Sequence, residues 1–248
     1  MESVLIEVTF IAGPLLVALF VSAGSALSAV LFSAACALSG TVAYASQRAL
    51  ANRRANANRA AGGLGPLDNP AFARLLAVAV LYASAFGLVE IGVVAYAVES
   101  GAPALAGLLL GAMSAGSVAG GLAYGARTWS LPPVRQFPRI LALMALGIAL
   151  LGFALPLWLW ALCCVVAGIA MAPALIVQSM LVAKTSELQH AAEAFTWSAT
   201  ALLAGIGGGL ALGGKLLESA PWPAVFAAAA AASLVAAALA LRQPGPAA

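Results

Sequence analysis

The chain has 248 residues, of which 64% are hydrophobic and only 8% are charged, and its formal net charge is +3. This composition excludes a soluble globular domain, because 11 basic and 8 acidic side chains cannot cover the surface of one. Repeated apolar segments must instead face lipid or one another, so the chain is expected to reside in a lipid bilayer.

Eight apolar segments are long enough to form membrane-spanning helices. At a rise of about 1.5 Å per residue, each crosses a hydrocarbon core of about 30 Å. Because Ala and Leu dominate and no strand pattern competes, the sequence predicts an all-α polytopic membrane protein. The eight predicted transmembrane helices run over residues 3–21, 26–46, 72–98, 103–126, 138–156, 157–183, 194–217 and 222–242.

The basic residues fall on one side of this predicted topology. All but one of the 11 would lie on the side that holds both termini, and Lys215 alone would lie on the other. Short loops rich in Lys and Arg stay in the cytoplasm, so we predict a multi-pass protein of the cell membrane (inner or plasma) with both termini cytoplasmic. This placement explains the net charge without a nucleic-acid partner. Tryptophans on the opposite side are predicted to form an interfacial aromatic belt: Trp158, Trp160 and Trp222.

A loop rich in Arg, Asn and Gly divides the chain into two helices, a cytoplasmic linker, a six-helix unit and a tail. These cover residues 1–46, 47–71, 72–242 and 243–248. The six helices form two triplets, 72–156 and 157–242. Because three is odd, the second triplet enters the membrane from the opposite side, which predicts an inverted 3+3 repeat.

The middle helix of each triplet is rich in glycine. Several glycines are four residues apart, as in GSVAG and GLALG, and this spacing lets helix backbones approach closely in lipid. A similar density of glycines in the middle helices of both triplets favours an internal repeat. For any single motif, the alternative is that the glycines serve ordinary helix packing.

Three stretches resemble motifs of the major facilitator superfamily of secondary transporters, in particular its bacterial drug-efflux-like members. FIAGPLLVALF keeps Gly13 and Pro14 of the antiporter motif in the family's fifth helix, and AEAFTWSATALLAGIGGGLALGGKLLE is similar to its eleventh helix. GGLAYGAR is similar to the second copy of the family's loop motif, with Tyr124 in place of the usual acidic residue. The matching residues of this stretch are Gly120, Gly121, Gly125 and Arg127.

The resemblance implies a register and a function. The two helices before the linker match the family's fifth and sixth, and the six after it match the complete C-terminal half, so the first four helices of a twelve-helix transporter are expected to be missing. A complete transporter of this kind would export small hydrophobic or cationic molecules in exchange for protons. We therefore expect a truncated or split proton-coupled efflux transporter. The alternative is a non-transporting membrane subunit, or an inactive fragment, that packs with a separate N-terminal half.

Glu90 is a carboxylate within the apolar stretch LYASAFGLVEIGVVAYAVES. It lies about 18 residues, or roughly 27 Å, into its predicted helix, in the outer half of the membrane. A charge near the bilayer centre costs about 3 kcal/mol, and such residues usually mark substrate or proton pathways. We predict that Glu90 binds a proton or a cationic group of the substrate. A side chain that reaches the interface, or that accepts a hydrogen bond from a neighbouring helix, is the alternative.

Five other side chains are candidates for lining a binding site. Gln178 is the most isolated polar residue of its helix, and it is expected to bond either a substrate or a neighbouring helix. The remaining four are expected either to line an apolar cavity or to pack between helices: Tyr82, Phe86, Thr196 and Trp197.

The sequence shows no pattern of an enzyme. It contains no metal-binding HExxH, Walker phosphate loop or dinucleotide-binding fingerprint, and its three cysteines lie in apolar segments without metal-ligand spacing. We therefore predict no enzymatic activity, no cofactor and no metal, with the lipid bilayer, a small-molecule substrate and protons as partners.

Overall fold

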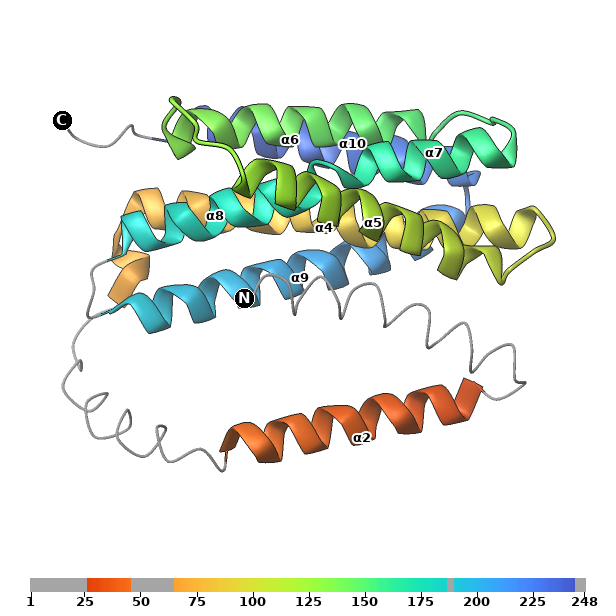
Figure 1. Cartoon of the computed structure of the whole chain (residues 1–248), viewed down its shortest axis with the longest axis horizontal. Helices are drawn as coiled ribbons and strands as arrows, with labels where there is room; N and C mark the ends of the chain where they lie inside the picture. The colour runs from red at the N-terminus through yellow and green to blue at the C-terminus, as the bar shows by residue number, and fades with distance from the viewer. Residues whose placement is uncertain (1–25, 46–64, 187–189, 244–248) are drawn as a thin grey trace.

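The computed structural model describes residues 26–45, 65–186 and 190–243, and the regular elements in these ranges are all helices (Figure 1). The prediction of an all-α chain is therefore confirmed for the described residues. The elements are α2 (Ala26–Ala45), the 3-10 turn η1 (Gly65–Asp68), α4 (Pro70–Glu99), α5 (Leu105–Gly125), α6 (Pro133–Leu150), α7 (Leu157–Gly168), α8 (Met171–Thr185), α9 (Ala191–Leu217) and α10 (Trp222–Ala240).

Six apolar segments of the described chain are long enough to cross a membrane. α7 and α8 together form one of them, Leu157–Thr185, and α4, α5, α6, α9 and α10 form the others. By length and composition the protein is thus polytopic and membrane-spanning. The predicted helix at 3–21, which holds Gly13 and Pro14, lies outside the described residues, as does most of the linker 47–71. The total of eight spans stays a prediction.

α4 begins and ends at residues whose chemistry suits a helix end. The Asn69 side-chain oxygen accepts a hydrogen bond of 2.9 Å from the Ala71 amide, and Pro70 occupies the first helical position. After Glu99 the chain turns at Gly101, whose φ of 73° is a left-handed value that glycine adopts without strain. The predicted helix at 72–98 therefore extends slightly at both ends.

α6 begins earlier than the predicted boundary at 138. Its first residue is Pro133, and Pro138 lies inside the helix. The fixed φ of a proline suits the first position of a helix, where its missing amide hydrogen would have no partner in any case. Pro138 follows within the second turn, where its missing amide hydrogen removes a single backbone hydrogen bond.

The span predicted at 157–183 is present, but its helix is interrupted. α7 ends at Gly168 and α8 begins at Met171. Pro173 has no amide hydrogen, and in a continuous helix its ring would clash with the carbonyl of Ile169, four residues earlier. The freed Ile169 carbonyl lies against Gly120 of α5, where a Cβ would overlap it.

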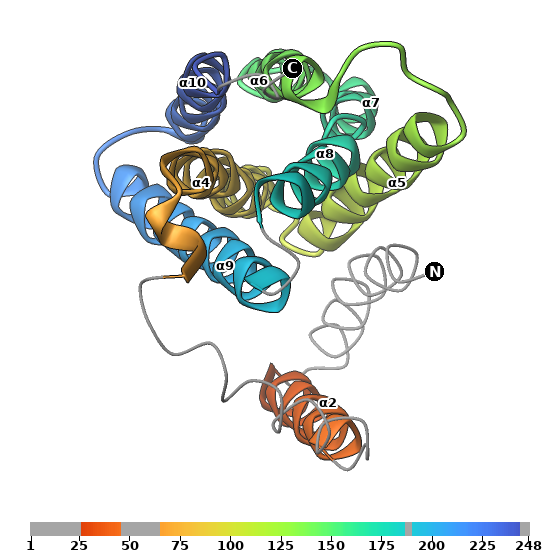
Figure 2. The same cartoon turned by 90° about the vertical axis from the view of Figure 1, so that its left-hand side faces the viewer.

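The helices form a bundle in which α4 and α8 lie between α9 and α5, with α6 and α10 along one flank (Figure 2). α4 packs chiefly on α9 and α10, whereas α7 and α8 pack chiefly on α5 and α6. The first helix of each predicted triplet therefore packs on the second and third helices of the other triplet. α2 lies apart from the bundle in both views, and many of its apolar side chains are exposed, including Leu27, Leu31 and Leu38 (Figures 1 and 2).

Glycines bring the backbones of α4 and α9 into contact. A Cβ at Gly209 would overlap the Ser84 carbonyl oxygen. A Cβ at Gly87 would overlap the Ile206 carbonyl oxygen. Only hydrogen fits at these two positions, so the small-residue spacing of α9 serves close packing as predicted.

The crossing of α5 and α7 has the same register. A Cβ at Gly116 would overlap the Val165 carbonyl oxygen, and one at Gly168 would overlap the Met113 carbonyl oxygen. In this crossing, as in that of α4 and α9, the two glycine contacts are three residues apart on each helix. The two crossings therefore share one pattern of glycine contacts.

Two of the three tryptophans predicted for an interfacial belt lie in the core instead. Trp160 is fully buried and Trp222 is 7% exposed, whereas Trp158 is 72% exposed. The Trp160 ring stacks on Tyr96 with centroids 4.0 Å apart and meets Phe226 edge-on at 5.8 Å. A neighbouring proline places a tryptophan near the end of a helix, but it does not determine which side of the helix carries the ring.

Candidate functional site

A buried chain of hydrogen bonds joins α4, α8 and α9. The Tyr82 hydroxyl donates to the side-chain oxygen of Gln178, and the Gln178 Nε2 donates to the Ser198 Oγ at 2.7 Å. Tyr82 is fully buried, and Gln178 and Ser198 are 2% and 6% exposed. Buried polar groups need partners because an unpaired one is costly, so these bonds hold the three helices in register.

The sequence predictions include two residues of this hydrogen-bonded series, Tyr82 and Gln178, but not Ser198. The pattern that could have identified Ser198 is a stripe of residues along one face of α9. The buried residues of this stripe recur every three or four positions. The stripe consists of Ala194, Ser198, Ala201, Gly205, Gly209 and Gly213. A hydroxyl within a stripe of such small residues faces a neighbouring helix, and Gln178 is the partner that the fold supplies.

Aromatic rings surround Tyr82, at one end of this series of hydrogen bonds. Phe86, one turn along α4, meets the Tyr82 ring edge-on with centroids 5.5 Å apart. Phe137 of α6 meets it edge-on at 6.0 Å. The structure therefore brings three of the predicted candidates together, Tyr82, Phe86 and Gln178, and adds Phe137 and Ser198 to them.

Thr196 and Trp197 lie outside this cluster. Both side chains are exposed, and the Thr196 hydroxyl donates to the Ala192 carbonyl of its own helix at 2.9 Å. Each residue of an α-helix is turned by about 100° from the one before it, so these two residues point away from the buried face that holds Ser198.

Glu90 lies two helical turns beyond Tyr82 on α4, about 12 Å along the axis. Its side chain is exposed, and among the described residues it has no hydrogen-bond or ion-pair partner. Gly87 and Ile91 beside it contact α9, whereas Val94, one turn further, is 36% exposed. Glu90 therefore occupies a part of α4 that no described helix covers.

The residues of the GGLAYGAR stretch have separate positions in the structure. Gly120 packs on Ile169, directly after the end of α7, and Gly121 packs on Ala172 of α8, whereas a Cβ at Gly125 would meet open space. Arg127 follows the end of α5, and its guanidinium carbon lies 5.4 Å from the centroid of the Trp129 ring.

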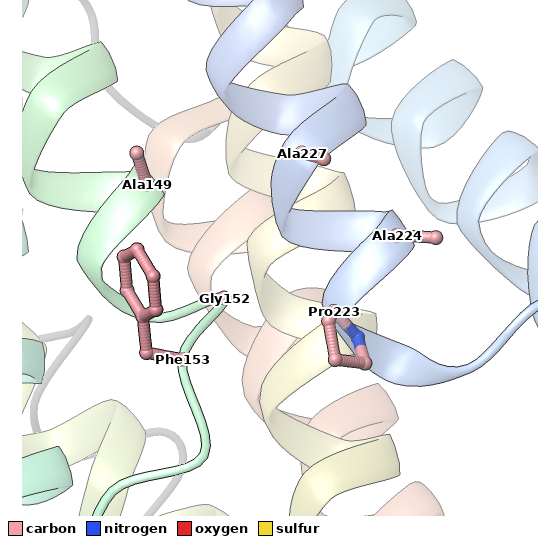
Figure 3. Close-up of a pocket in the computed structure, with 6 residues that line it drawn as sticks. All are labelled: Ala149, Gly152, Phe153, Pro223, Ala224 and Ala227. Atoms are coloured by element: carbon pink, nitrogen blue, oxygen red, sulfur yellow. The ribbon is translucent and has the colours of Figure 1, made fainter.

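Within the described residues, no group of three or more His, Cys, Asp or Glu side chains could hold a metal ion. An open, apolar pocket lies between the end of α6 and the start of α10 (Figure 3). It is lined by Ala149, Gly152, Phe153, Pro223, Ala224 and Ala227. None of these side chains ionises, so this pocket does not supply the group that a proton or a cation needs.

No family model matches the sequence, and no curated protein or solved structure is significantly similar to it. Fold and composition therefore define the class to which the chain belongs, that of polytopic, all-helical membrane proteins. Two features of the described residues are candidates for a function: the hydrogen-bonded series from Tyr82 to Ser198, and the carboxylate of Glu90, which has no partner among these residues.

Replacing Gln178 with leucine is expected to lower the free energy of unfolding by about 1–3 kcal/mol, because two buried hydroxyls lose their partner. Adding Tyr82→Phe is expected to recover about 1 kcal/mol, since it removes the hydroxyl that the first substitution leaves unpaired. The measurement is SDS-induced unfolding of the full chain in mixed micelles, followed by circular dichroism. Strictly additive effects of the two substitutions would show that the bond between Tyr82 and Gln178 does not contribute to stability.

Proposed function

We propose that this protein is a secondary transporter of the major facilitator type, or one part of such a transporter, and that it exports small hydrophobic or cationic molecules in exchange for protons. One observation carries the proposal. The carboxylate of Glu90 lies within a 30-residue apolar helix, is exposed, and has no hydrogen-bond or ion-pair partner among the described residues. The resemblance of three sequence stretches to the motifs of that family supports the same function.

The depth of Glu90 suits a group that binds a proton or a cation. It lies about 30 Å from the start of α4 and about 14 Å from its end, which is inside a hydrocarbon core of about 30 Å centred on the helix. A carboxylate at this depth is costly unless it faces a polar cavity, takes up a proton or pairs with a cation. The ring of Phe86, one turn away on α4, adds an aromatic surface that suits a hydrophobic cation.

The packing of the two triplets supports a transporter architecture. α4 meets α9, and α7 meets α5, through glycine contacts with the same spacing. Two three-helix units that exchange equivalent contacts, and that enter the membrane from opposite sides, form an inverted repeat. Many secondary transporters have this architecture, with the transport site at the interface of the repeats. Tyr82 and Gln178 belong to the first helices of the two predicted triplets, and their hydrogen bond joins the triplets.

The distribution of charge supports one orientation. Among the described residues, the basic side chains other than Lys215 lie at the end of the bundle where α4 begins and α10 ends. We propose that this end is cytoplasmic, because Lys and Arg are retained on that side of a cell membrane. These residues are Arg74, Arg127, Arg135, Arg139, Lys184 and Arg242.

Transport by the full chain in proteoliposomes tests the proposal. The probe is ethidium, a hydrophobic cation, and its fluorescence reports its movement after a pH gradient is imposed. Glu90→Gln removes the titrating group with little change in size, so it is expected to reduce ethidium movement to the rate of protein-free vesicles. The matched control is Glu99→Gln at the end of α4, which is expected to transport like the wild type.

An active wild type whose transport is unchanged by Glu90→Gln would exclude Glu90 as the group that binds the proton or the cation. Equal losses in the Glu90 and Glu99 variants would show that the effect comes from the charge of α4 as a whole rather than from this position.

The uncovered part of α4 and the exposed apolar side chains of α2 also support a second function. In this case the protein is a membrane subunit that does not transport by itself and that packs with a separate N-terminal half. The full chain would then be inactive in proteoliposomes, and mild detergent would extract it from its own membrane in a stoichiometric complex with a second polytopic protein. Ethidium transport by the purified chain alone would exclude this function.

A further inference from the structure

Three arginines at one end of the bundle have no acidic partner among the described residues. Arg127 follows α5, and Arg135 and Arg139 lie in the first two turns of α6. All three are exposed, and none of them forms an ion pair with a described residue. At the opposite end, Lys215 does pair with Glu218, at 2.7 Å. The three guanidinium groups are therefore available to an anion from outside the protein.

Aromatic contacts join the loop between α5 and α6 to the end of α5. The Trp129 indole donates a hydrogen bond of 3.0 Å to the Tyr124 carbonyl, and the two rings stack with centroids 5.1 Å apart. The Arg127 guanidinium lies over the Trp129 ring. Because Trp129 is still 45% exposed, the loop presents an indole and a guanidinium together at the surface.

Gln136 fixes the start of α6 against this loop. It is buried, its side-chain oxygen accepts a hydrogen bond of 2.6 Å from the Tyr124 hydroxyl, and its Nε2 donates to the Leu131 carbonyl at 2.5 Å. Arg135, the residue before it on the helix, is exposed.

The outer face of α6 is apolar beyond these arginines. Arg135 and Arg139 lie one turn apart on the same face, close enough to contact a single phosphate group. At about 100° per residue, the same face continues with exposed leucines, and the opposite face is buried in the bundle. The exposed leucines are Leu143, Leu146 and Leu150. In a bilayer, the two guanidinium groups would therefore stand at the membrane surface, above a face of α6 that would meet the acyl chains.

We propose that Arg127, Arg135 and Arg139 bind the phosphate of an anionic phospholipid headgroup, with Trp129 at the membrane interface beside it. A guanidinium matches phosphate oxygens with a planar pair of donors, and an anionic lipid surface attracts basic residues near it. Tryptophan and tyrosine are enriched at the interface between a membrane and water, at the level of the lipid headgroups. The assignment requires only that the chain spans a membrane, and it is independent of the proposed transport.

Native mass spectrometry of the full chain in detergent micelles tests this site. The protein is titrated with an equimolar mixture of phosphatidylglycerol and phosphatidylcholine that carry identical acyl chains, and the bound lipids are compared. We expect a preference for phosphatidylglycerol that falls about five-fold for each arginine removed. The double variant Arg135→Gln/Arg139→Gln is therefore expected to lose the preference. Arg135→Lys/Arg139→Lys keeps both charges and is expected to keep most of it.

The matched control removes two basic residues from the same end of the bundle but outside this site, Lys184→Gln/Arg242→Gln. It is expected to keep the preference, and circular dichroism verifies that each variant retains the helical content of the wild type. An equal loss in this control would show that net charge alone attracts the lipid, and would overturn the site. A wild type without a preference would do the same. Full occupancy by inorganic phosphate in the absence of lipid would show a site for soluble anions and would exclude the headgroup assignment.

Discussion

Replacing Gly209 with alanine is expected to lower the free energy of unfolding by about 3 kcal/mol, at the upper end of the usual cost of overpacking. The added Cβ would overlap the carbonyl oxygen of Ser84 on α4. A helix backbone cannot turn aside as the end of a flexible side chain can, so α4 and α9 would have to separate. The Gln178–Ser198 bond, which also reaches α9, would lengthen with them.

The neighbouring glycine is the matched control, because a Cβ at Gly208 meets open space. Gly208→Ala is expected to leave stability unchanged or to raise it by up to about 1 kcal/mol, since alanine favours a helix more than glycine does. SDS-induced unfolding of both full-length variants gives the two free energies. Equal effects at Gly208 and Gly209 would show that the contact with Ser84 does not hold the helices together.

The equivalent position on α5 extends this test to the other crossing. Gly116→Ala is expected to destabilise the bundle as much as Gly209→Ala does, because its Cβ would overlap the Val165 carbonyl. The control there is Gly111→Ala, at a position with open space around it. A loss at Gly209 without a comparable loss at Gly116 would contradict the equivalence of the two crossings.

Replacing Trp160 with alanine is expected to cost about 3–5 kcal/mol of stability, the usual cost of removing a buried tryptophan. The ring is fully buried and stacks on Tyr96, with Trp222 and Phe226 meeting it edge-on. Its indole N–H also donates to the Leu151 carbonyl at 3.2 Å. The substitution therefore leaves a cavity between α4, α7 and α10 and removes the partner of that carbonyl.

Trp158 is the matched control, because it lies on the same helix but is 72% exposed. Trp158→Ala is expected to change the free energy of unfolding by less than about 0.5 kcal/mol. Trp160→Phe keeps an aromatic ring in the cluster, so it is expected to fold and to show an intermediate loss. The near-ultraviolet circular dichroism of each variant during SDS titration follows the unfolding. Equal effects at Trp158 and Trp160 would contradict the buried position of the Trp160 ring.

The helices themselves follow from hydrophobicity and length, because a backbone in lipid must satisfy its hydrogen bonds within a helix. The six spans of the described chain agree with this prediction. Helix ends are predicted less well. The start of α6 at Pro133 and the break before Met171 depend on the position of a proline relative to the helical turn. The hydrophobicity of the sequence does not predict this effect.

Part of the candidate site is also predictable. Tyr82 and Gln178 can be predicted as candidates because a polar group in an apolar helix is rare and costly. Their contact is not predictable, since the two residues are 96 positions apart and meet only when α4 packs on α8. Ser198 is not predicted, because serine is common in apolar helices. Its position on the buried face of α9 is what brings it into contact with Gln178.

Composition and the order of residues are enough to predict a helical chain that is apolar enough to span a membrane, with basic residues at alternate helix ends. The buried side of each helix depends on how the helices pack, so that Gly209 contacts a backbone and Gly208 does not. In a soluble helix, an apolar stripe marks the buried side. In lipid both sides are apolar, and the buried side is selected by the close fit of backbones and by the few polar groups that find partners.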